Sequence, residues 1–362
     1  MRRQSTAADG QRRATVTDVA RRAGVSTATV SRVLNRNYPV AEATRERVES
    51  AMRELGYVVN AHARALAGVS NRTVGIIVNE VIDPFYAYIA RGVEREAALG
   101  GRLCLVCCTQ GDPQRELAFI DLMHERRADA VVVVGGSIAD RGYTSELARR
   151  ARELDAGGSK LVLCGRPPLD DPAPTAAVEY DNEGGAFAIT DHLLMQGHER
   201  ILYLGGPPKL STTRDRLAGH LRALELRGVP QDRDLAQPGA FSRGFGYRRM
   251  AELLRDGPDF TAVFAANDMV AAGAAQALEE AGLRVPEDIS LVGYDDIPVA
   301  QELRPRLTTV HVPLEEMGRQ AVRLAVSGDD DWREPTTGAL RLGTHIVVRD
   351  SVAPRAGRGS RT

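Results

Sequence analysis

The chain has 362 residues, of which 43% are hydrophobic and 26% are charged, the balance of a soluble globular protein. This length exceeds what one ordinary core supports, so we expect a small module and a larger, divided body. No run approaches the ~18 apolar residues of a membrane-spanning helix, and the basic residues 1–13 have no apolar stretch behind them. The composition therefore predicts no membrane segment, no secretion signal and a cytoplasmic location.

The net charge of −1 is the sum of two unlike parts. Residues 1–72 contain 13 arginines against six acidic residues, so this segment carries +7 and residues 73–362 carry −8. A basic module of this size favours binding to a polyanion, although basic tails are often only solubilising. We expect a disordered basic tail at 1–13.

The sequence VTDVARRAGVSTATVSRVLN at 16–35 predicts two short helices joined by a tight turn. Thr17 is expected to cap a first helix over 18–23, Gly24 permits the turn, Val25 fills the angle between the helices, and Ser26 caps the second helix. The inward side chains should be Val19, Ala20, Ala23, Val30, Val33 and Leu34. This pattern predicts a helix-turn-helix, with a plain helical hairpin as the alternative.

The outer face of the second helix carries Thr27, Ala28, Thr29, Ser31 and Arg32. Small polar residues at a helix start let the backbone N–H groups approach phosphates and base edges, and an arginine can bind guanine through two hydrogen bonds. We therefore expect Thr27, Ala28 and Arg32 to read the DNA sequence.

A third helix is predicted over 43–55, where Val48, Ala51, Met52 and Leu55 would close the small core. The next helix-prone stretch, 61–67, has Leu66 as its one large apolar side chain, and helices this short are marginal alone. Two such helices from a dimer would meet in the minor groove with Leu66 wedged between base pairs. The alternative is a flexible linker.

These segments resemble the DNA-binding head of the lactose/galactose repressor (LacI/GalR) family. The resemblance rests on DVARRAGVSTATVSRVLN at 18–35, TRERV at 44–48, AMRELGYVVN at 51–60 and ARALAG at 63–68, in family order. It implies that Thr27 and Ala28 choose bases, that Arg32 contacts DNA, that Asn60 and Ala63 are hinge positions and that Leu66 is the wedge. The full predicted DNA-binding set is Thr17, Ser26, Thr27, Ala28, Thr29, Ser31, Arg32, Asn35, Asn60, Ala63 and Leu66.

Beyond residue 72, apolar strand-like runs alternate with amphipathic helices. The runs are TVGIIV, LCLVCC, AVVVVG, KLVLCG, AAVEYD, RILYLGG, AVFAAN and ISLVGYDD, and the helices are expected over 88–99, 115–126, 184–196, 217–226 and 269–281. This alternation predicts an α/β body of two doubly wound parallel-sheet lobes behind the all-α head.

Open α/β sheets bind ligands beyond the carboxyl ends of their strands. Those ends fall at 79–86, 135–136, 165–166, 180–182, 205–216, 241, 267–268 and 295–296. Hydrogen-bonding groups there are Arg166, Arg216, Asn267 and Asp295, and flat faces are Phe85, Tyr86 and Phe241. This combination suits a sugar or a stacked nucleobase.

Enzyme chemistry has no local support in the body. The sequence contains no GxGxxG, GxxxxGKS or G-x-S-x-G motif, and neighbouring carboxylates such as Asp295 and Asp296 usually point apart after a strand. Cys104 and Cys107 have metal-like spacing, but no second Cys or His pair completes a ligand set. We expect no catalytic residues, no metal and no cofactor other than a small-molecule effector.

The family resemblance continues through DNEGGAFAITDHL, GHERILYLGGP, RLAGH, FAANDMVAAGA, GLRVPEDISLVGYDD and LTTVHVP, and covers residues 14–352. It implies a body like the periplasmic sugar-binding proteins, effector contacts at Arg216, Asn267 and Asp295, and aromatic pocket positions at Phe85, Tyr86 and Phe241. Arg166 of CGRP is the less direct match.

The resemblance implies a repressor of transcription that binds a palindromic DNA operator as a homodimer under the control of an effector. A sugar is the expected effector, and a purine or other nucleobase is the alternative because the Ser-Thr-x-Thr-Val motif is closest to the purine-repressor version. A sugar-binding or sugar-metabolising protein is the alternative of another class. Residues 351–362, SVAPRAGRGSRT, lack an apolar heptad repeat, so we expect a dimer rather than a tetramer.

The expected domains are a helix-turn-helix module at 14–60, a hinge and linker at 61–72, a body at 73–352 and a disordered tail at 353–362. Within the body we expect lobe 1 at 73–178 and 308–335, and lobe 2 at 179–307 and 336–352.

Overall fold

The computed structural model describes residues 14–35, 38–57, 72–169, 172–255, 257–326 and 339–355. Its chain divides into two compact units, Met1–Asn71 and Arg72–Thr362. The first is the head and the second is the body. Within the described ranges, no helix is long and apolar enough to cross a membrane. The predicted tail at 1–13 and hinge at 61–71 lie outside the described residues.

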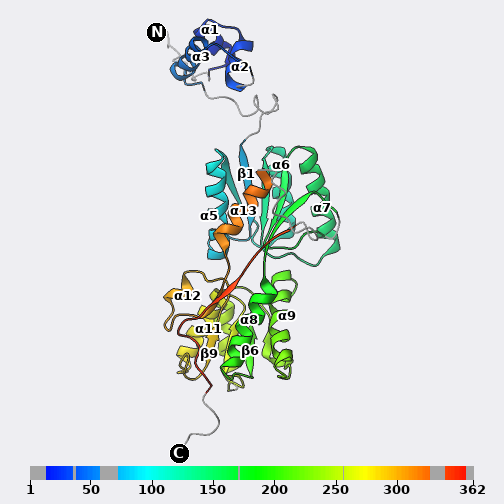
Figure 1. Ribbon diagram of the computed structural model, residues 1–362, viewed down its shortest axis with the longest axis vertical. Helices are drawn as coiled ribbons and strands as arrows, with labels where there is room; N and C mark the ends of the chain where they lie inside the picture. The colour runs from blue at the N-terminus through cyan, green and yellow to red at the C-terminus, as the bar shows by residue number, and fades with distance from the viewer. Residues whose placement is uncertain are drawn as a thin grey trace, which may run out of the picture. The chain divides into compact units, whose positions relative to one another are not determined.

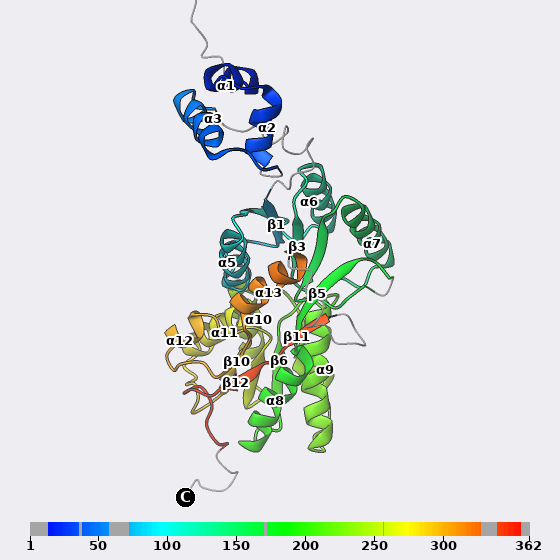
Figure 2. The same cartoon turned by 45° about the horizontal axis from the view of Figure 1, so that its top comes forward.

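The described residues of the head form three packed helices, α1 (Val16–Ala23), α2 (Thr27–Asn35) and α3 (Glu42–Glu54) (Figure 2). Their shared core is formed by Val19, Ala20, Ala23, Val30, Val33, Val48 and Ala51, with Val25, Leu34, Met52 and Leu55 packed against it. Gly24 adopts a left-handed conformation with φ of +65°, which a side chain would disfavour, and it ends α1. The turn therefore sets α1 and α2 at an angle, as expected of a helix-turn-helix.

The cap of α1 differs from the prediction. Thr15, not Thr17, is the N-cap: its hydroxyl accepts the Asp18 backbone N–H, and the Asp18 carboxylate accepts the Thr15 N–H at 3.0 Å. This reciprocal capping box satisfies backbone donors at both ends of the motif and outcompetes a cap two residues later. Ser26 caps α2 as predicted, with its Oγ accepting the Thr29 N–H at 3.1 Å.

Lobe 1 is built on a six-stranded parallel sheet in the order β11-β5-β4-β3-β1-β2. The strands are β1 (Thr73–Val78), β2 (Leu103–Cys108), β3 (Ala130–Val134), β4 (Lys160–Cys164), β5 (Thr175–Tyr180) and β11 (Ala339–Leu342). Alternate residues of β1 face opposite ways: Ile76 packs with α5 (Pro84–Leu99) and α13 (Leu314–Val326), and Ile77 packs with α6 (Pro113–Glu125) and α7 (Arg141–Ala156). Helices therefore cover both faces.

Lobe 2 repeats this plan on a four-stranded parallel sheet in the order β7-β6-β8-β9. The strands are β6 (Ile201–Leu204), β7 (Ala236–Gln237), β8 (Ala262–Ala265) and β9 (Ser290–Val292). Tyr203 and Phe264 share a cluster with α8 (Asn182–Met195) and α9 (Ser211–Leu226), while Leu202 and Val263 pack with α10 (Arg243–Arg255) and α11 (Asp268–Glu280). Short helices η1 (Arg233–Leu235) and α12 (Val299–Glu302) complete the lobe. Figure 1 shows the two lobes as distinct layers of the body, joined by the segments that cross between them.

The chain crosses between the lobes near one edge, and the predicted lobe boundaries are wrong there. β11 pairs with β5 in lobe 1, although 336–352 was expected in lobe 2. The chain returns to lobe 2 only at β12 (His345–Val347), which pairs antiparallel with β10 (Thr309–His311). Thr308, expected in lobe 1, bridges to Val292 of lobe 2. Apolar alternation alone does not reveal which sheet edge a late strand joins.

The predicted tail also begins too early. The Ala353 N–H donates to Ser290 Oγ at 3.1 Å and the Arg355 N–H donates to the Gln196 carbonyl at 2.8 Å. These bonds hold 353–355 against lobe 2, and only 356–362 lie outside the described residues.

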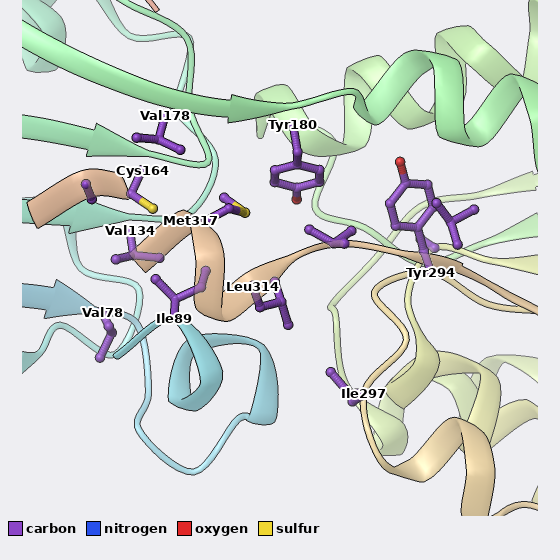
Figure 3. Close-up of a cluster of buried hydrophobic side chains, with 14 of the residues drawn as sticks. Val78, Ile89, Val134, Cys164, Val178, Tyr180, Tyr294, Ile297, Leu314 and Met317 are labelled. Atoms are coloured by element: carbon purple, nitrogen blue, oxygen red, sulfur yellow. The ribbon is translucent and has the colours of Figure 1, made fainter. Parts of the chain in front are cut away.

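One apolar cluster runs through the crossover region and includes residues of both lobes. Figure 3 shows Val78, Val134, Cys164 and Val178 of lobe 1 near Met317 of α13, with Tyr180 and Tyr294 beyond them on the side of lobe 2. Because this core is continuous, a change in the angle between the lobes must repack it.

Candidate functional site

A cavity lies between the lobes, at the carboxyl ends of strands from both sheets. Lobe 1 lines it from the β1–α5 turn, the end of β3 and the end of β5, and lobe 2 lines it from α9 and the ends of β7, β8 and β9. The lining residues are Asp83, Phe85, Tyr86, Gly135, Gly136, Tyr180, Leu210, Thr212, Arg216, Phe241, Asn267 and Asp295. Its position, beyond the carboxyl ends of parallel strands, is that of a small-molecule site.

Arg216 of α9 is the buried centre of the site, with 1% of its surface exposed. Its Nη2 donates to Asp295 Oδ1 at 2.8 Å and to the Tyr180 hydroxyl at 3.0 Å, its Nε donates to Asn182 Oδ1 at 2.9 Å, and its Nη1 donates to the Ala266 carbonyl. The guanidinium carbon lies 3.7 Å from the centre of the Tyr294 ring. Contacts to both lobes therefore fix this cation in place.

Asp295 follows β9 and is held by the backbone as well as by Arg216. Its N–H donates to the Val310 carbonyl at 2.9 Å, and its φ of +104° is a strained conformation for a residue with a side chain. Burial raises the pKa of Asp295 to about 6, although the Arg216 cation pulls that pKa down. The carboxylate pairs with the Arg216 cation at 2.8 Å and can accept a hydrogen bond from a ligand hydroxyl.

Aromatic rings close the lobe 1 side. Phe85 and Tyr86 contact each other edge to face, with ring centres 5.2 Å apart, and Phe85 lies 6.5 Å from the Tyr180 ring. From lobe 2, the Phe241 ring centre lies 5.7 Å from the Arg216 guanidinium carbon. Such rings pack against the apolar faces of sugars or stack on a base.

Asn267 is the N-cap of α11, where its Oδ1 accepts the Val270 N–H at 2.9 Å. The cap fixes the side chain at the mouth of the helix and against the cavity. The next residue, Asp268, is fully buried and does not line the cavity; it accepts from the Thr309 hydroxyl at 2.6 Å and from the Ile297 N–H at 2.9 Å. Burial raises the pKa of Asp268 well above its usual value.

Six of the seven predicted effector residues line the cavity, and Arg166 does not. Its Nη1 donates to Glu116 Oε1 and to the Tyr143 hydroxyl, both at 3.0 Å, and its Nε donates to the Gly135 carbonyl at 2.9 Å. These buried partners turn the guanidinium into lobe 1, where it neutralises the Glu116 carboxylate. Assigning Arg166 to the cavity from its place after a strand was wrong.

The sequence did not single out Asp83 and Tyr294. Asp83 lies within the strand-end range 79–86 and is followed by Pro84 at the start of a helix. Its position therefore indicates a helix cap rather than a residue that contacts a ligand. Tyr294 lies beneath Arg216 and donates to the carbonyl of Asp181 at 3.1 Å. Only the three-dimensional fold brings this ring under the arginine.

The outer face of the head is polar and accessible. Thr17 of α1, and Thr27, Ala28, Ser31 and Arg32 of α2, are exposed, while Thr29 is half-buried and its hydroxyl lies 2.9 Å from Ser26 Oγ. The Arg32 guanidinium carbon lies 5.7 Å from the centre of the Tyr38 ring. The Asn35 side chain and all of Asn60, Ala63 and Leu66 lie outside the described part of the chain.

Comparison with known proteins agrees with both units. Residues 15–60 match the model of bacterial regulatory proteins of the lacI family, and residues 190–352 match the periplasmic binding protein-like domain. The HTH-type transcriptional regulator GalR of Escherichia coli (strain K12) is 39% identical over 342 residues, which cover 94% of this chain and 96% of that protein.

Two solved structures cover 94% of this chain and all of their own length. The lac repressor dimer bound to operator and the anti-inducer ONPF is 27% identical with a TM-score of 0.79, and the complex of the transcriptional regulator CelR with cellobiose is 35% identical with a TM-score of 0.66. The chain therefore belongs to the lacI family of bacterial regulatory proteins and is a DNA-binding transcription regulator.

Proposed function

We propose that this regulator is a cytoplasmic repressor that binds a palindromic operator as a homodimer, and that a sugar in the interlobe cavity controls its affinity for DNA. The observation that carries the proposal is the Arg216–Asp295 pair, which is buried at a cavity that both lobes line. A ligand there touches both lobes, so it favours whichever lobe orientation it fits best.

The α2 face is the proposed reader of the DNA sequence. Arg32 is exposed and lies one helical turn beyond Ala28, and Thr27 begins the same helix, so we expect all three to reach base edges in a major groove. Thr17, Ser26, Thr29, Ser31 and Asn35 would position the helix on the phosphates. Asn60, Ala63 and Leu66 are the proposed hinge contacts in the minor groove.

Arg32→Ala tests this assignment on the full chain. We expect operator affinity to fall about 10-fold or more, as for the loss of a bidentate base contact, with effector binding unchanged. Arg21→Ala is the matched control, because it removes the same charge from α1, where Arg21 pairs with Asp18 at 3.3 Å. Equal losses in the two variants would mean that Arg32 supplies only charge.

A sugar suits the cavity because a carboxylate accepts hydrogen bonds from hydroxyls and an amide both accepts and donates them. Aromatic rings cover the apolar faces of the sugar. Asp295 and Asn267 supply the polar groups from lobe 2, and Phe85, Tyr86 and Phe241 supply the rings. The CelR relative was solved with cellobiose. A nucleobase stacked on Phe85 or Tyr86 is the second candidate.

Calorimetric titration of the full chain with ribose, glucose, galactose and cellobiose, and separately with hypoxanthine and adenine, distinguishes the two ligand classes. We expect one or more sugars to bind wild type and to bind Asp295→Asn at least about 10-fold more weakly, since a charge-assisted hydrogen bond is lost. Binding of a base alone would replace the sugar with a nucleobase effector. The sign of the effect on operator affinity tells inducer from co-repressor.

The proposed homodimer needs an apolar surface, and β2 offers one. β2 is an edge strand of the lobe 1 sheet, and it leaves Leu103 63% exposed and Val106 47% exposed, close in sequence to the exposed Leu99. An exposed apolar edge of this kind favours pairing with a second copy. Sedimentation of Val106→Asp is expected to show monomer where wild type shows dimer, and a dimeric variant would move the interface elsewhere.

A further inference from the structure

The charges around the cavity restrict its ligand more than the hydroxyl-binding chemistry does. Among the described residues that line it, the ionisable side chains other than tyrosines are Asp83, Arg216 and Asp295. Two of these are carboxylates, one from each lobe. The single cation therefore determines whether an anionic ligand has a partner.

Arg216 has few free hydrogen-bond donors for an anionic ligand. Four of its five N–H groups already donate to protein acceptors, and both Nη2 bonds go to Tyr180 and to the Asp295 carboxylate. Tyr294 covers one face of the guanidinium at 3.7 Å. A phosphate or carboxylate is held best by an open fork of two donors, whereas Arg216 keeps one Nη1 N–H without an acceptor among the described residues, and a second bond would require a ligand anion to displace a protein acceptor.

Asp83 adds negative charge from the opposite lobe. It is the N-cap of α5, and its Oδ1 accepts the Phe85 N–H at 3.0 Å. Its Oδ2 accepts no hydrogen bond from the residues that the structure describes, although the side chain lines the cavity. One oxygen therefore serves the helix, and the other is available to a ligand.

We infer that the cavity selects an uncharged polyol over its anionic derivatives and that Asp83 determines this specificity by accepting a hydrogen bond from an effector hydroxyl. The inference rests on the proposed function of the cavity as a sugar site. A hydroxyl donates to the Asp83 carboxylate with a charge-assisted bond, whereas a phosphate or carboxylate would meet the like charges of Asp83 and Asp295. Sugar phosphates and sugar acids are thereby rejected.

Paired calorimetric titrations of the full chain at pH 7.5 test the selection. The probes are glucose and glucose 6-phosphate, ribose and ribose 5-phosphate, and galactose and galacturonate. For the pair whose neutral member binds, we expect the anionic member to bind at least about 100-fold more weakly. An anion that binds as tightly as its parent overturns the inference and leaves the sugar site intact. Binding of hypoxanthine or adenine in place of every sugar overturns the proposed function as well.

The variant Asp83→Asn assigns the effect to one side chain. Asparagine caps a helix as well as aspartate does, so α5 is retained. We expect the neutral sugar to bind this variant about 10-fold more weakly than wild type. The ratio of the dissociation constants of the anionic and the neutral sugar, the gap between them, should fall about 10-fold or more. Asp83→Ser, which also caps, should narrow the gap similarly.

Asp112→Asn is the matched control, because Asp112 caps α6 through the Gln114 N–H at 2.8 Å and is also followed by proline, but does not line the cavity. It should leave both affinities unchanged. If Asp83→Asn retains the wild-type gap, or if Asp112→Asn narrows it equally, Asp83 does not determine the specificity.

Discussion

The buried pair of Arg216 and Asp295 makes a strong prediction about stability. The two side chains are 1% and 3% exposed and their charges meet at 2.8 Å. Removing one partner leaves the other charge buried without compensation, which costs about 3–5 kcal/mol of folding free energy. Arg216→Met and Asp295→Asn should each lose this much, while the double variant should lose about 2–3 kcal/mol less than the sum of the two.

Urea unfolding of the full chain, followed by far-UV circular dichroism at pH 7, measures these free energies. Arg306→Met is the control, because Arg306 and Asp350 pair at 2.8 Å while each is more than half exposed, and its unfolding midpoint should not move. Additive losses in the double variant would refute the reasoning, since they would mean that the two charges do not compensate each other.

Three further predictions concern parts of the molecule away from the cavity. Burial lowers the pKa of His220 from 6.5 to about 4. The unfolded state therefore binds the extra proton, and the free energy of unfolding falls by up to ~3 kcal/mol as pH drops from 6.5 through 4. The urea midpoints at pH 7 and pH 4.5 should differ less in His220→Gln than in wild type, and an equal difference in the two proteins would contradict this. Ser26→Ala removes the α2 cap and should cost the head about 1 kcal/mol, seen as faster hydrogen exchange of α2 amides, whereas unchanged exchange would show that the cap is dispensable. A Cβ at Gly246 of α10 would meet the Val270 carbonyl oxygen of α11 at 2.2 Å, so Gly246→Ala should lower the free energy of unfolding by about 1–3 kcal/mol. Gly343→Ala is the control, because a Cβ there meets nothing within 4 Å. Equal melting temperatures of the two variants would contradict close packing of α10 on α11.

Most of the fold was predictable because its signals are local. The apolar runs of β1, β3 and β4 are buried on both faces, and their continuous hydrophobicity marks parallel strands between helices. The predicted helices did not include α7, α10 and α13, although each has buried apolar side chains at helical spacing, such as Leu147, Ala151 and Leu154 of α7. It also misassigned β11, because edge pairing depends on contacts between segments far apart in the chain.

The location of the candidate site was predictable from the topology of the sheets, but its residues were predicted only in part, because side-chain directions depend on the folded structure. Parallel strands of one sheet end on one edge, so residues after β8 and β9 of lobe 2 had to approach one another, whereas β5 belongs to the lobe 1 sheet and meets them only because both lobes line the cavity. Whether a side chain turns towards that edge depends on its partners, and Arg166 turns away because Glu116 and Tyr143 lie behind it. Asp83 was obscured by its role as a helix cap.

In the proposed function, a ligand held at Asp295 controls DNA binding by the head. The most direct test is the fluorescence anisotropy of a labelled operator duplex, first recovered by selection from genomic fragments, titrated with the full chain with and without the sugar found by calorimetry. We expect the sugar to shift the operator affinity of wild type about 5-fold or more and to leave the operator affinity of Asp295→Asn unchanged at the same sugar concentration. A sugar that binds wild type without moving its operator affinity, or that moves the affinity of both proteins equally, would contradict it.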